Sequence, residues 1–200
     1  MTNAKRAVKA ETIQANIVKA LQSRIDAAPN ANQADNLTAE RKFFEGSSAL
    51  AMIEKCKALE IDFQALARKF EIADKSNADF VAVYALQKIR KALFALALNS
   101  RASFDKYSNS IIQNLCELQD LNTKHTRMSI CNAIEFDELE QVRAIKRYHN
   151  CSESTASTQS SSTRMMLNYL NICAVAKGRK NDVMSFADTL AAKQVQAMFA

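Results

Sequence analysis

The sequence predicts an all-α protein, a helical bundle of about eight or nine helices around a buried central helix at residues 79–98, with a C-terminal helical hairpin. The first observation is the scarcity of glycine and proline. The 200 residues hold two glycines and one proline, namely Gly46, Gly178 and Pro29. An average soluble protein of this length would hold about fourteen glycines and about ten prolines. Because the tight turns of sheets depend on these residues, their scarcity favours helices joined by short polar connections.

The second observation is apolar spacing of helical period, which begins near the N-terminus. A helix is expected over about residues 3–28, where Ile13, Ile17 and Leu21 share one face. Pro29 and the asparagines at 30, 32 and 36 then predict a polar loop. The next helix is expected to start after Thr38 and to reach about residue 60, with Gly46 inside it as a bend or as the site where another helix crosses closely.

The most apolar stretch of the chain is predicted to be the centre of the bundle. A short helix capped by Asp62 comes first, and residues 76–79 then open the helix that runs to residue 98. Apolar residues cover nearly the whole circumference of this helix, which is typical of a buried helix. Lys88, Arg90 and Lys91 interrupt the stretch, so it is not expected to span a membrane.

Three further helices are expected between residues 103 and 149. They cover about residues 103–121, 123–134 and 137–149. The last one has its acidic residues first and its basic residues last, which suits the helix dipole.

A serine- and threonine-rich stretch separates these helices from the C-terminus. Nine of the twelve residues from 152 to 163 are Ser or Thr, which predicts a linker or loop. Two helices should follow, one ending at Gly178 and one running from about residue 182 to 198. The expected organisation is therefore a bundle at 1–151, a linker at 152–163, and a hairpin at 164–200 that docks on the bundle or on a partner.

Charge and cysteine usage narrow the class of protein. The net charge of +6 favours anionic partners, but residues 1–36, 37–100 and 152–200 each carry only +2 and residues 101–151 carry none. The five cysteines are odd in number and lack CxxC spacing, so we expect reduced thiols in the cytoplasm. The N-terminus lacks the apolar segment of a secretory signal.

Basic residues near predicted helix ends are the candidate nucleic-acid contacts. Arg143, Lys146 and Arg147 lie on one side of the helix at 137–149, and the turn at 177–180 carries three more cations. Helix capping and the helix dipole also account for such positions. The predicted nucleic-acid-binding residues are Arg143, Lys146, Arg147, Arg164, Lys177, Arg179 and Lys180.

Other candidates have simpler structural interpretations. The segment 61–91 resembles a helix-turn-helix only faintly, because its second helix is apolar nearly all round. The tract at 152–163 could be phosphorylated, but it lacks a basic or proline-directed context. Met165, Met166 and Tyr169 form a stripe that suits a partner, although core packing explains it as well.

Few groups of residues in the sequence could bind a metal ion or catalyse a reaction. Four residues are of types that bind zinc, but their spacing matches no zinc motif: His125, Cys131, His149 and Cys151. Cys131 with His125 could form a nucleophile and base, and Asp137, Glu138 and Glu140 are better explained as a helix start. Phosphate loops and the common hydrolase motifs are missing from the sequence. We therefore expect no catalytic site, no metal and no cofactor.

The sequence thus favours a non-enzymatic protein that binds a macromolecule through a helical surface. Nucleic acid is the preferred partner, held by the cations above. The alternative is a protein partner, including a second copy of the chain in a homo-oligomer, contacted by the first helix or by the C-terminal pair. An assembly or accessory protein of a virus or mobile element fits the same composition, and it would work in the host cytoplasm.

Overall fold

The computed structural model describes residues 8–135, 145–146, 149–178 and 181–200. Across these residues it contains nine α-helices and one small three-stranded sheet, which confirms the predicted all-α class. The chain divides into two compact units. Unit 1 holds residues 1–58 and 62–83, and unit 2 holds residues 59–61 and 84–200. In the described ranges, no helix is long and apolar enough to cross a membrane.

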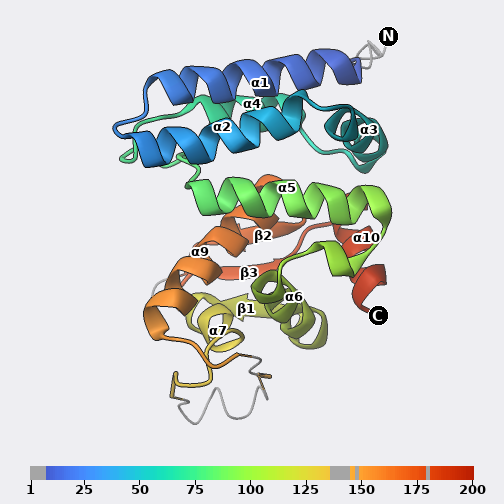
Figure 1. The fold of residues 1–200 in the computed structure, drawn as a ribbon. Helices are drawn as coiled ribbons and strands as arrows, with labels where there is room; N and C mark the ends of the chain where they lie inside the picture. The colour runs from blue at the N-terminus through green and yellow to red at the C-terminus, as the bar shows by residue number, and fades with distance from the viewer. Residues whose placement is uncertain (1–7, 136–144, 147–148, 179–180) are drawn as a thin grey trace. The chain divides into compact units, whose positions relative to one another are not determined.

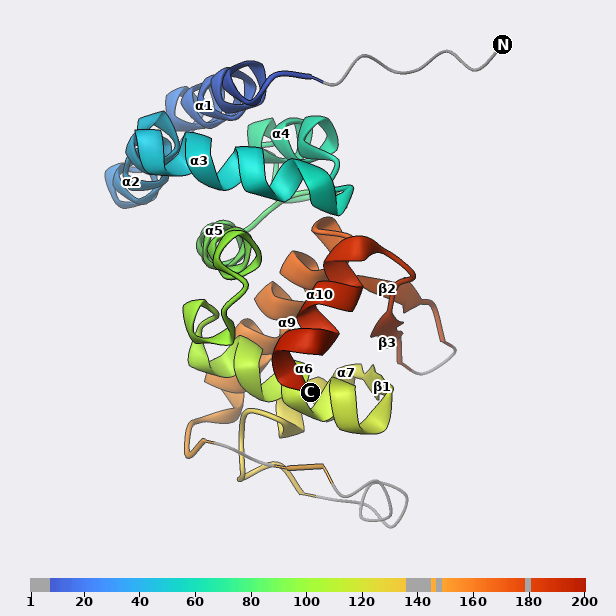
Figure 2. The same cartoon turned by 90° about the vertical axis from the view of Figure 1, so that its right-hand side faces the viewer.

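Unit 1 is a four-helix cluster. Its helices are α1 (Ala10–Asp26), α2 (Ala31–Glu45), α3 (Ser47–Cys56) and α4 (Phe63–Glu71). Helices α1 and α2 lie side by side, and α3 runs across them (Figures 1 and 2). The predicted apolar face of α1 is buried, with Ile17 and Leu21 fully inaccessible. The ring of Phe44 from α2 packs 6.3 Å from that of Phe70 from α4.

The start and end of α2 differ from the expectation. The predicted loop at 29–36 is wrong, because Asn30 caps a helix there by accepting a hydrogen bond from the Gln33 N–H at 3.0 Å. The predicted bend at Gly46 is a break between α2 and α3. The Gln14 amide donates to the carbonyls of Phe44 and Gly46 at 2.7 and 3.0 Å, so the end of α2 is satisfied by α1.

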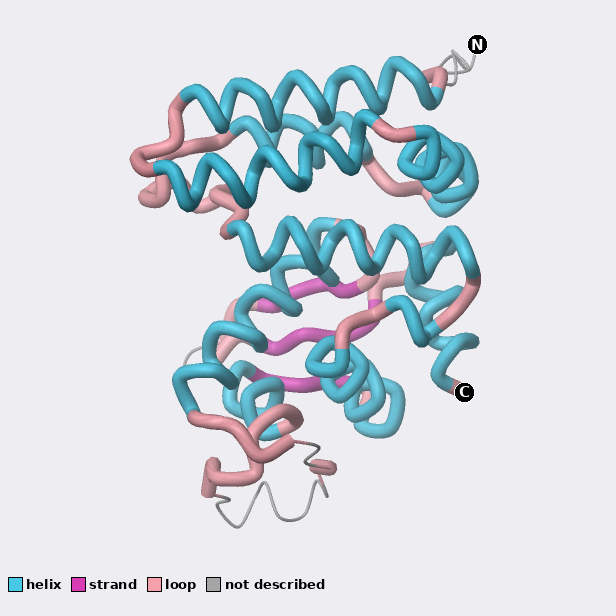
Figure 3. The backbone as a smooth tube through the Cα atoms, viewed as in Figure 1, coloured by secondary structure: helices cyan, strands magenta, loops and turns pink. Residues whose placement is uncertain are grey.

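Unit 2 contains the other helices and the sheet. The helices are α5 (Val83–Leu98), α6 (Lys106–Leu118), α7 (Thr123–Met128), α9 (Glu153–Tyr169) and α10 (Leu190–Phe199). Strands β1 (Asp120–Asn122), β3 (Val183–Phe186) and β2 (Cys173–Ala176) form an antiparallel sheet with β3 in the middle (Figure 3). Helix α5 buries most of its circumference, but it exposes Tyr84, Lys91 and Leu98.

The Ser/Thr tract is helical, so the predicted linker at 152–163 is wrong. Ser152 caps α9 by accepting from the Thr155 N–H at 3.2 Å. Four small side chains at helical spacing are buried: Ala156, Ser160, Ser162 and Thr163. Their hydroxyls bond to carbonyls within the helix or to α6, so the tract packs although its residues are poor helix formers.

The C-terminal pair is not the helical hairpin that the spacing predicted. The first predicted helix ends at Tyr169, and residues 173–176 and 183–186 form a β-hairpin before α10. Leu121 of β1 and Val175 of β2 both pair with Met184, which is fully buried in β3. The third strand gives this short hairpin the partner that an isolated pair would lack.

Other boundaries also differ from those predicted. Helix α5 begins at Val83, α6 is shorter at both ends, and α7 stops at Met128. The predicted helix at 137–149 lies mainly outside the described residues. Of its described positions, 145 and 146 are not helical, and His149 forms a β-bridge with Cys131.

Helix ends compensate for the scarcity of glycine. In the described part of the chain, four non-glycine residues adopt the left-handed conformation, each directly after or near the end of a helix: Glu60, Asn99, Gln119 and Asn171. Gln119, with φ of 67°, donates its N–H to the carbonyl of Leu115 at 2.8 Å. These positions usually carry glycine, so the chain accepts some backbone strain at helix ends.

Candidate nucleic-acid interface

The structure places three of the seven predicted nucleic-acid-binding residues. Arg143, Arg147, Arg179 and Lys180 lie outside the described residues. The structure describes the other three, which are Lys146, Arg164 and Lys177.

Lys146 lies against α6 and its charge is partly offset. Its Nζ is 2.6 Å from Oε1 of Glu117, and hydrogen bonding from Lys146 lowers the pKa of that carboxyl. The backbone is also held, because the Lys146 N–H donates to Oδ1 of Asn114 at 2.9 Å and the Asn114 amide donates back at 2.8 Å. A phosphate at Lys146 would compete with Glu117.

Arg164 and Lys177 lie at the turn end of the β2–β3 hairpin. Arg164 donates from Nη1 to Oγ1 of Thr123 at 2.7 Å. Burial lowers the pKa of Arg164, and the negative charge of Asp182, in that turn, opposes this shift. Lys177 follows the last pair of the hairpin and is exposed. The structure therefore brings Arg164 near this turn, but it gives Arg164 a structural partner there.

A different cluster of cations surrounds a pocket in unit 2, which we call the α5–α6–α9 pocket. Its volume is about 360 Å³, within the range of small-ligand sites. The lining comes from three helices and the residue before α6. It consists of Tyr84, Gln87, Lys88, Lys91, Asp105, Lys106, Tyr107 and Gln159.

Two residues of this lining, Lys88 and Asp105, form a buried ion pair. Nζ of Lys88 lies 2.6 Å from Oδ1 of Asp105, and the two side chains are 5% and 15% exposed. Ser108 donates from Oγ to Oδ2 of Asp105 at 2.6 Å, and it also lies 3.1 Å from the hydroxyl of Thr163 in α9. Asp105 further caps α6 by accepting from the N–H groups of Tyr107 and Ser108. The network joins all three helices of the pocket.

The two charges of this pair respond differently to their surroundings. Burial lowers the pKa of Lys88, which Asp105 opposes and Lys91 reinforces. Burial alone would raise the pKa of Asp105, but the charge of Lys88 and hydrogen bonds from Lys88 and Ser108 outweigh burial and lower it. Each group supplies the other with a counter-charge that favours its ionised form.

The rim of the pocket carries two lysines whose charge is not offset. Lys91 and Lys106 are exposed, and no carboxylate among the described residues forms an ion pair with either. The ring of Tyr107 lies between cations, 4.9 Å from Nζ of Lys106 and 5.9 Å from Nζ of Lys88. The centroids of the Tyr107 and His149 rings are 5.0 Å apart, and the two rings are inclined by 75°. Tyr107 therefore positions the ammonium groups through cation–π contacts.

Three uncharged side chains complete the lining. Tyr84 is 58% exposed, the largest exposure of a large apolar side chain in the described part of the chain. The side-chain amides of Gln87 and Gln159 have no hydrogen-bond partner among the residues that the structure describes. Tyr84, Gln87 and Lys91 share one face of α5, because they are three and four residues apart.

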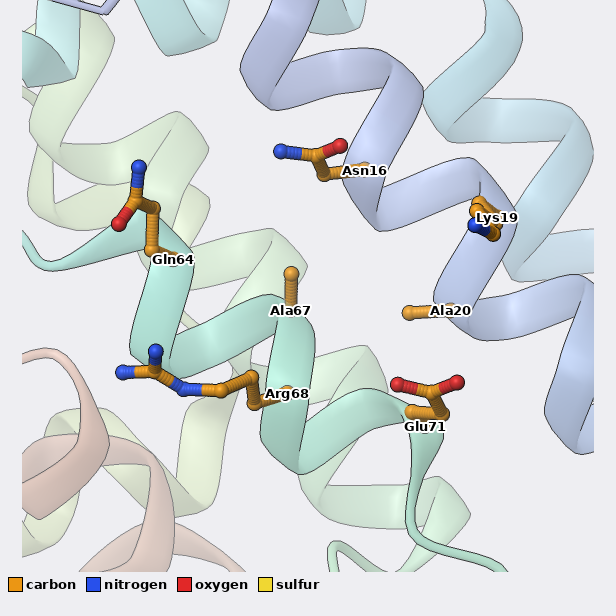
Figure 4. A pocket seen from close by; sticks show the side chains of 7 residues that line it. All are labelled: Asn16, Lys19, Ala20, Gln64, Ala67, Arg68 and Glu71. Carbon is orange, nitrogen blue, oxygen red and sulfur yellow. The ribbon is translucent and has the colours of Figure 1, made fainter.

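A second concavity lies in unit 1, between α1 and α4, with a volume of about 300 Å³. Figure 4 shows Ala20 of α1 and Ala67 of α4 in its lining, with polar side chains around them. Lys19 and Arg68 are its cations, and Glu71 is its carboxylate. The Arg68 side chain extends away from α1 in Figure 4, so the two cations do not converge. This groove is therefore a weaker anion site than the α5–α6–α9 pocket.

The remaining chemistry-bearing candidates are separated or structural. His125 is buried and belongs to a capping box with Asn122 at the start of α7. Cys131 donates from Sγ to the carbonyl of Cys151 at 2.8 Å, and His149 contacts Ser110 at 2.8 Å. Among the described residues, no group of three or more His, Cys, Asp or Glu side chains could hold a metal ion.

Two other candidate interfaces from the sequence, the Met/Tyr stripe of α9 and the segment 61–91, gain no support from the structure. Met166 is fully buried, and Met165 and Tyr169 are half-buried, as core packing of α9 implies. The faint helix-turn-helix at 61–91 is split, because α4 belongs to unit 1 and all of α5 except Val83 belongs to unit 2.

No protein-family model, curated protein or solved structure matches this chain.

The sequence alone did not predict the pocket, because Lys88, Arg90 and Lys91 were interpreted only as evidence against a membrane span. Cations inside the most apolar helix were nevertheless the available signal, because a buried lysine needs a counter-charge or a ligand. The partner Asp105 lies 17 residues further on and becomes apparent only from packing.

Proposed function

We propose that this protein is a non-enzymatic nucleic-acid-binding protein and that the α5–α6–α9 pocket is its binding site. The observation that carries the proposal is the presence, around one concavity, of tyrosine rings and of two lysines, Lys91 and Lys106, that form no ion pair with a described residue. Nucleic-acid affinity comes largely from lysine and arginine contacts to phosphates. Aromatic rings beside such cations are typical of sites that contact bases as well.

The buried pair beneath the pocket supports this assignment. Asp105 neutralises Lys88 and is itself enclosed by Lys88 and Ser108, so little negative charge remains to repel a phosphate. The excess charge of the pocket is then that of Lys91 and Lys106, which are exposed. A pocket whose one described carboxylate is internally paired, and whose further cations are exposed, favours an anionic ligand.

A protein partner is less well supported by the described surface. The amphipathic face of α1 is used within unit 1. Only Tyr84, Leu98 and Leu190 are large apolar side chains exposed among the described residues, and one of them lines the pocket. A docking face for another protein usually offers a contiguous apolar patch.

The proposal is tested by the salt dependence of binding. Fluorescence anisotropy of labelled random-sequence single strands and duplexes should give a log K that falls linearly with log salt. The double variant Lys91→Gln/Lys106→Gln should lower the magnitude of that slope by about 0.7 for single strands and about 0.9 for duplexes, the value for one lost phosphate contact.

The matched control is Lys55→Gln/Lys75→Gln, which removes the same charge from two exposed positions of unit 1. It should leave the slope nearly unchanged. Equal effects of both double variants would mean that net charge alone drives binding. Failure of the natural sequence to bind any strand at low salt would overturn the proposal.

A further inference from the structure

The α5–α6–α9 pocket offers more than a phosphate contact. A groove that only followed a duplex backbone would use cations and polar groups, but it would not need an exposed aromatic face. This pocket instead presents an exposed tyrosine and two amides that lack hydrogen-bond partners in the described residues. Such unused groups in one concavity point to a ligand with both a planar ring and polar edges.

The two tyrosines of the pocket have different surroundings. Tyr107 is already in contact with two ammonium groups and with the ring of His149. Tyr84 contacts no other ring or cation among the described residues and is 58% exposed. Tyr84 is thus the ring with a free face for stacking, whereas the Tyr107 ring contacts Lys88 and Lys106.

We infer that the pocket receives one unpaired nucleotide, whose base stacks on Tyr84 while its phosphate lies between Lys91 and Lys106. This inference rests on the proposed function and specifies its substrate class. Gln87 and Gln159 each carry an amide that donates and accepts, so they can hydrogen-bond the edge of an unstacked base. A base inside a duplex is stacked and paired, so it cannot enter a pocket of this kind without being flipped out.

The inference predicts a preference among ligands of equal charge. A twelve-nucleotide oligothymidine should bind at least tenfold more tightly than a duplex with the same number of phosphates, and than an abasic strand of the same length. Thymidine 5′-monophosphate is the arm that tests a free nucleotide as the source of the same chemistry. If thymidine 5′-monophosphate competes with the oligonucleotide at equal concentration, the nucleotide pocket is supported. The same result would overturn the binding of strands as the function.

The variants separate stacking from charge. Tyr84→Leu should weaken oligothymidine binding by roughly tenfold, since stacking on an aromatic ring contributes about that factor per base. Tyr84→Phe keeps the ring and should bind nearly as the natural sequence does. Leu98→Ala is the matched control, because Leu98 is 57% exposed on the same helix but outside the pocket.

The outcomes separate the nucleotide pocket from nucleic-acid binding as such. Equal binding of single strand, duplex and abasic strand, with Tyr84→Leu unchanged and Lys91→Gln/Lys106→Gln impaired, overturns the nucleotide pocket and leaves nucleic-acid binding in place. Absence of binding to every ligand at low salt overturns both. A tenfold loss in Tyr84→Leu that Tyr84→Phe does not share supports both.

Discussion

Unit 1 and unit 2 each bury one cation among the described residues, and the two are accommodated in different ways. In unit 1, Arg24 is 1% exposed and donates from Nη2 to the carbonyl of Val81 at 2.5 Å, with its guanidinium 4.7 Å from the centre of the Phe80 ring. Its Nε and Nη1 have no hydrogen-bond partner there. In unit 2, Lys88 is paired with a carboxylate and two hydroxyls complete the network.

The difference follows from the chemistry of the two cations. A guanidinium is flat and weakly hydrated, so it can lie on an aromatic ring and donate to a carbonyl. Burial alone accounts for the lowering of the Arg24 pKa to about 10. An ammonium is a compact, strongly hydrated charge and needs a counter-ion when buried. Arg24 therefore ties α1 to the segment before α5, whereas Lys88 is the centre of a charged network.

Breaking the network in unit 2 should give the largest effect. Lys88→Met leaves Asp105 buried without its counter-charge, and we expect a loss of about 3 kcal/mol in the free energy of unfolding. Chemical denaturation followed by circular dichroism measures this. Lys88→Met/Asp105→Asn should recover part of the loss, because neither charge remains and the asparagine can still cap α6.

Lys193→Met is the control for this prediction. Lys193 pairs with Asp188 at 2.7 Å on the surface, and both side chains are mostly exposed. Its removal should not measurably change stability, because exposed ion pairs contribute little. A similar small change for Lys88→Met would show that the buried pair does not stabilise unit 2.

The same network should make the protein acid-sensitive at a defined pH. The pKa of Asp105 is lowered below its ordinary value of 3.8 in the folded protein. The folded state thus binds this proton less tightly than the unfolded state, so the stabilisation is complete above about pH 3.8 and is lost as the pH falls toward the folded pKa. In that pH range, Asp105 should make the free energy of unfolding fall by up to about 1.4 kcal/mol for each pH unit of acidification.

Asp105→Asn checks the assignment of this acid limb. Its free energy of unfolding, measured by urea denaturation between pH 2 and 5, should fall less steeply with acid than that of the natural sequence. The two curves should converge at the lowest pH, where Asp105 is protonated in both states. Parallel curves would assign the acid sensitivity to other carboxyls.

The sequence predicted the helical class and several elements because their signals are local. Asp62 caps α4 as expected, with Oδ1 accepting from the Ala65 N–H at 2.9 Å, and the faces of α1 and α6 follow the apolar period. Such signals depend only on spacing and on one or two neighbouring residues.

The failures occurred where packing outweighed local preference. In α9 the serines and threonines disfavour a helix, but Ser108 of α6 meets Thr163 at 3.1 Å, and small side chains at this contact let the helices approach closely. The hairpin at 173–186 was assigned to helices because its strands are only four residues long and depend on β1, some 50 residues earlier. The pocket was missed for the same reason, since its lining comes from three helices.

The smallest expected effect on the free energy of unfolding is that of replacing Arg24, the buried cation of unit 1. Arg24→Met keeps a long unbranched side chain and removes two nitrogens that lack hydrogen bonds, at the loss of one hydrogen bond to Val81. Because these terms offset, we expect a change of about 1 kcal/mol or less, in contrast to Lys88→Met. Arg24→Lys should be the worse substitution, since a compact ammonium cannot stack on Phe80 as the guanidinium does and would be buried without a carboxylate. A loss for Arg24→Met as large as that for Lys88→Met would mean that the guanidinium, despite its missing partners, stabilises unit 1 as strongly as the ion pair stabilises unit 2.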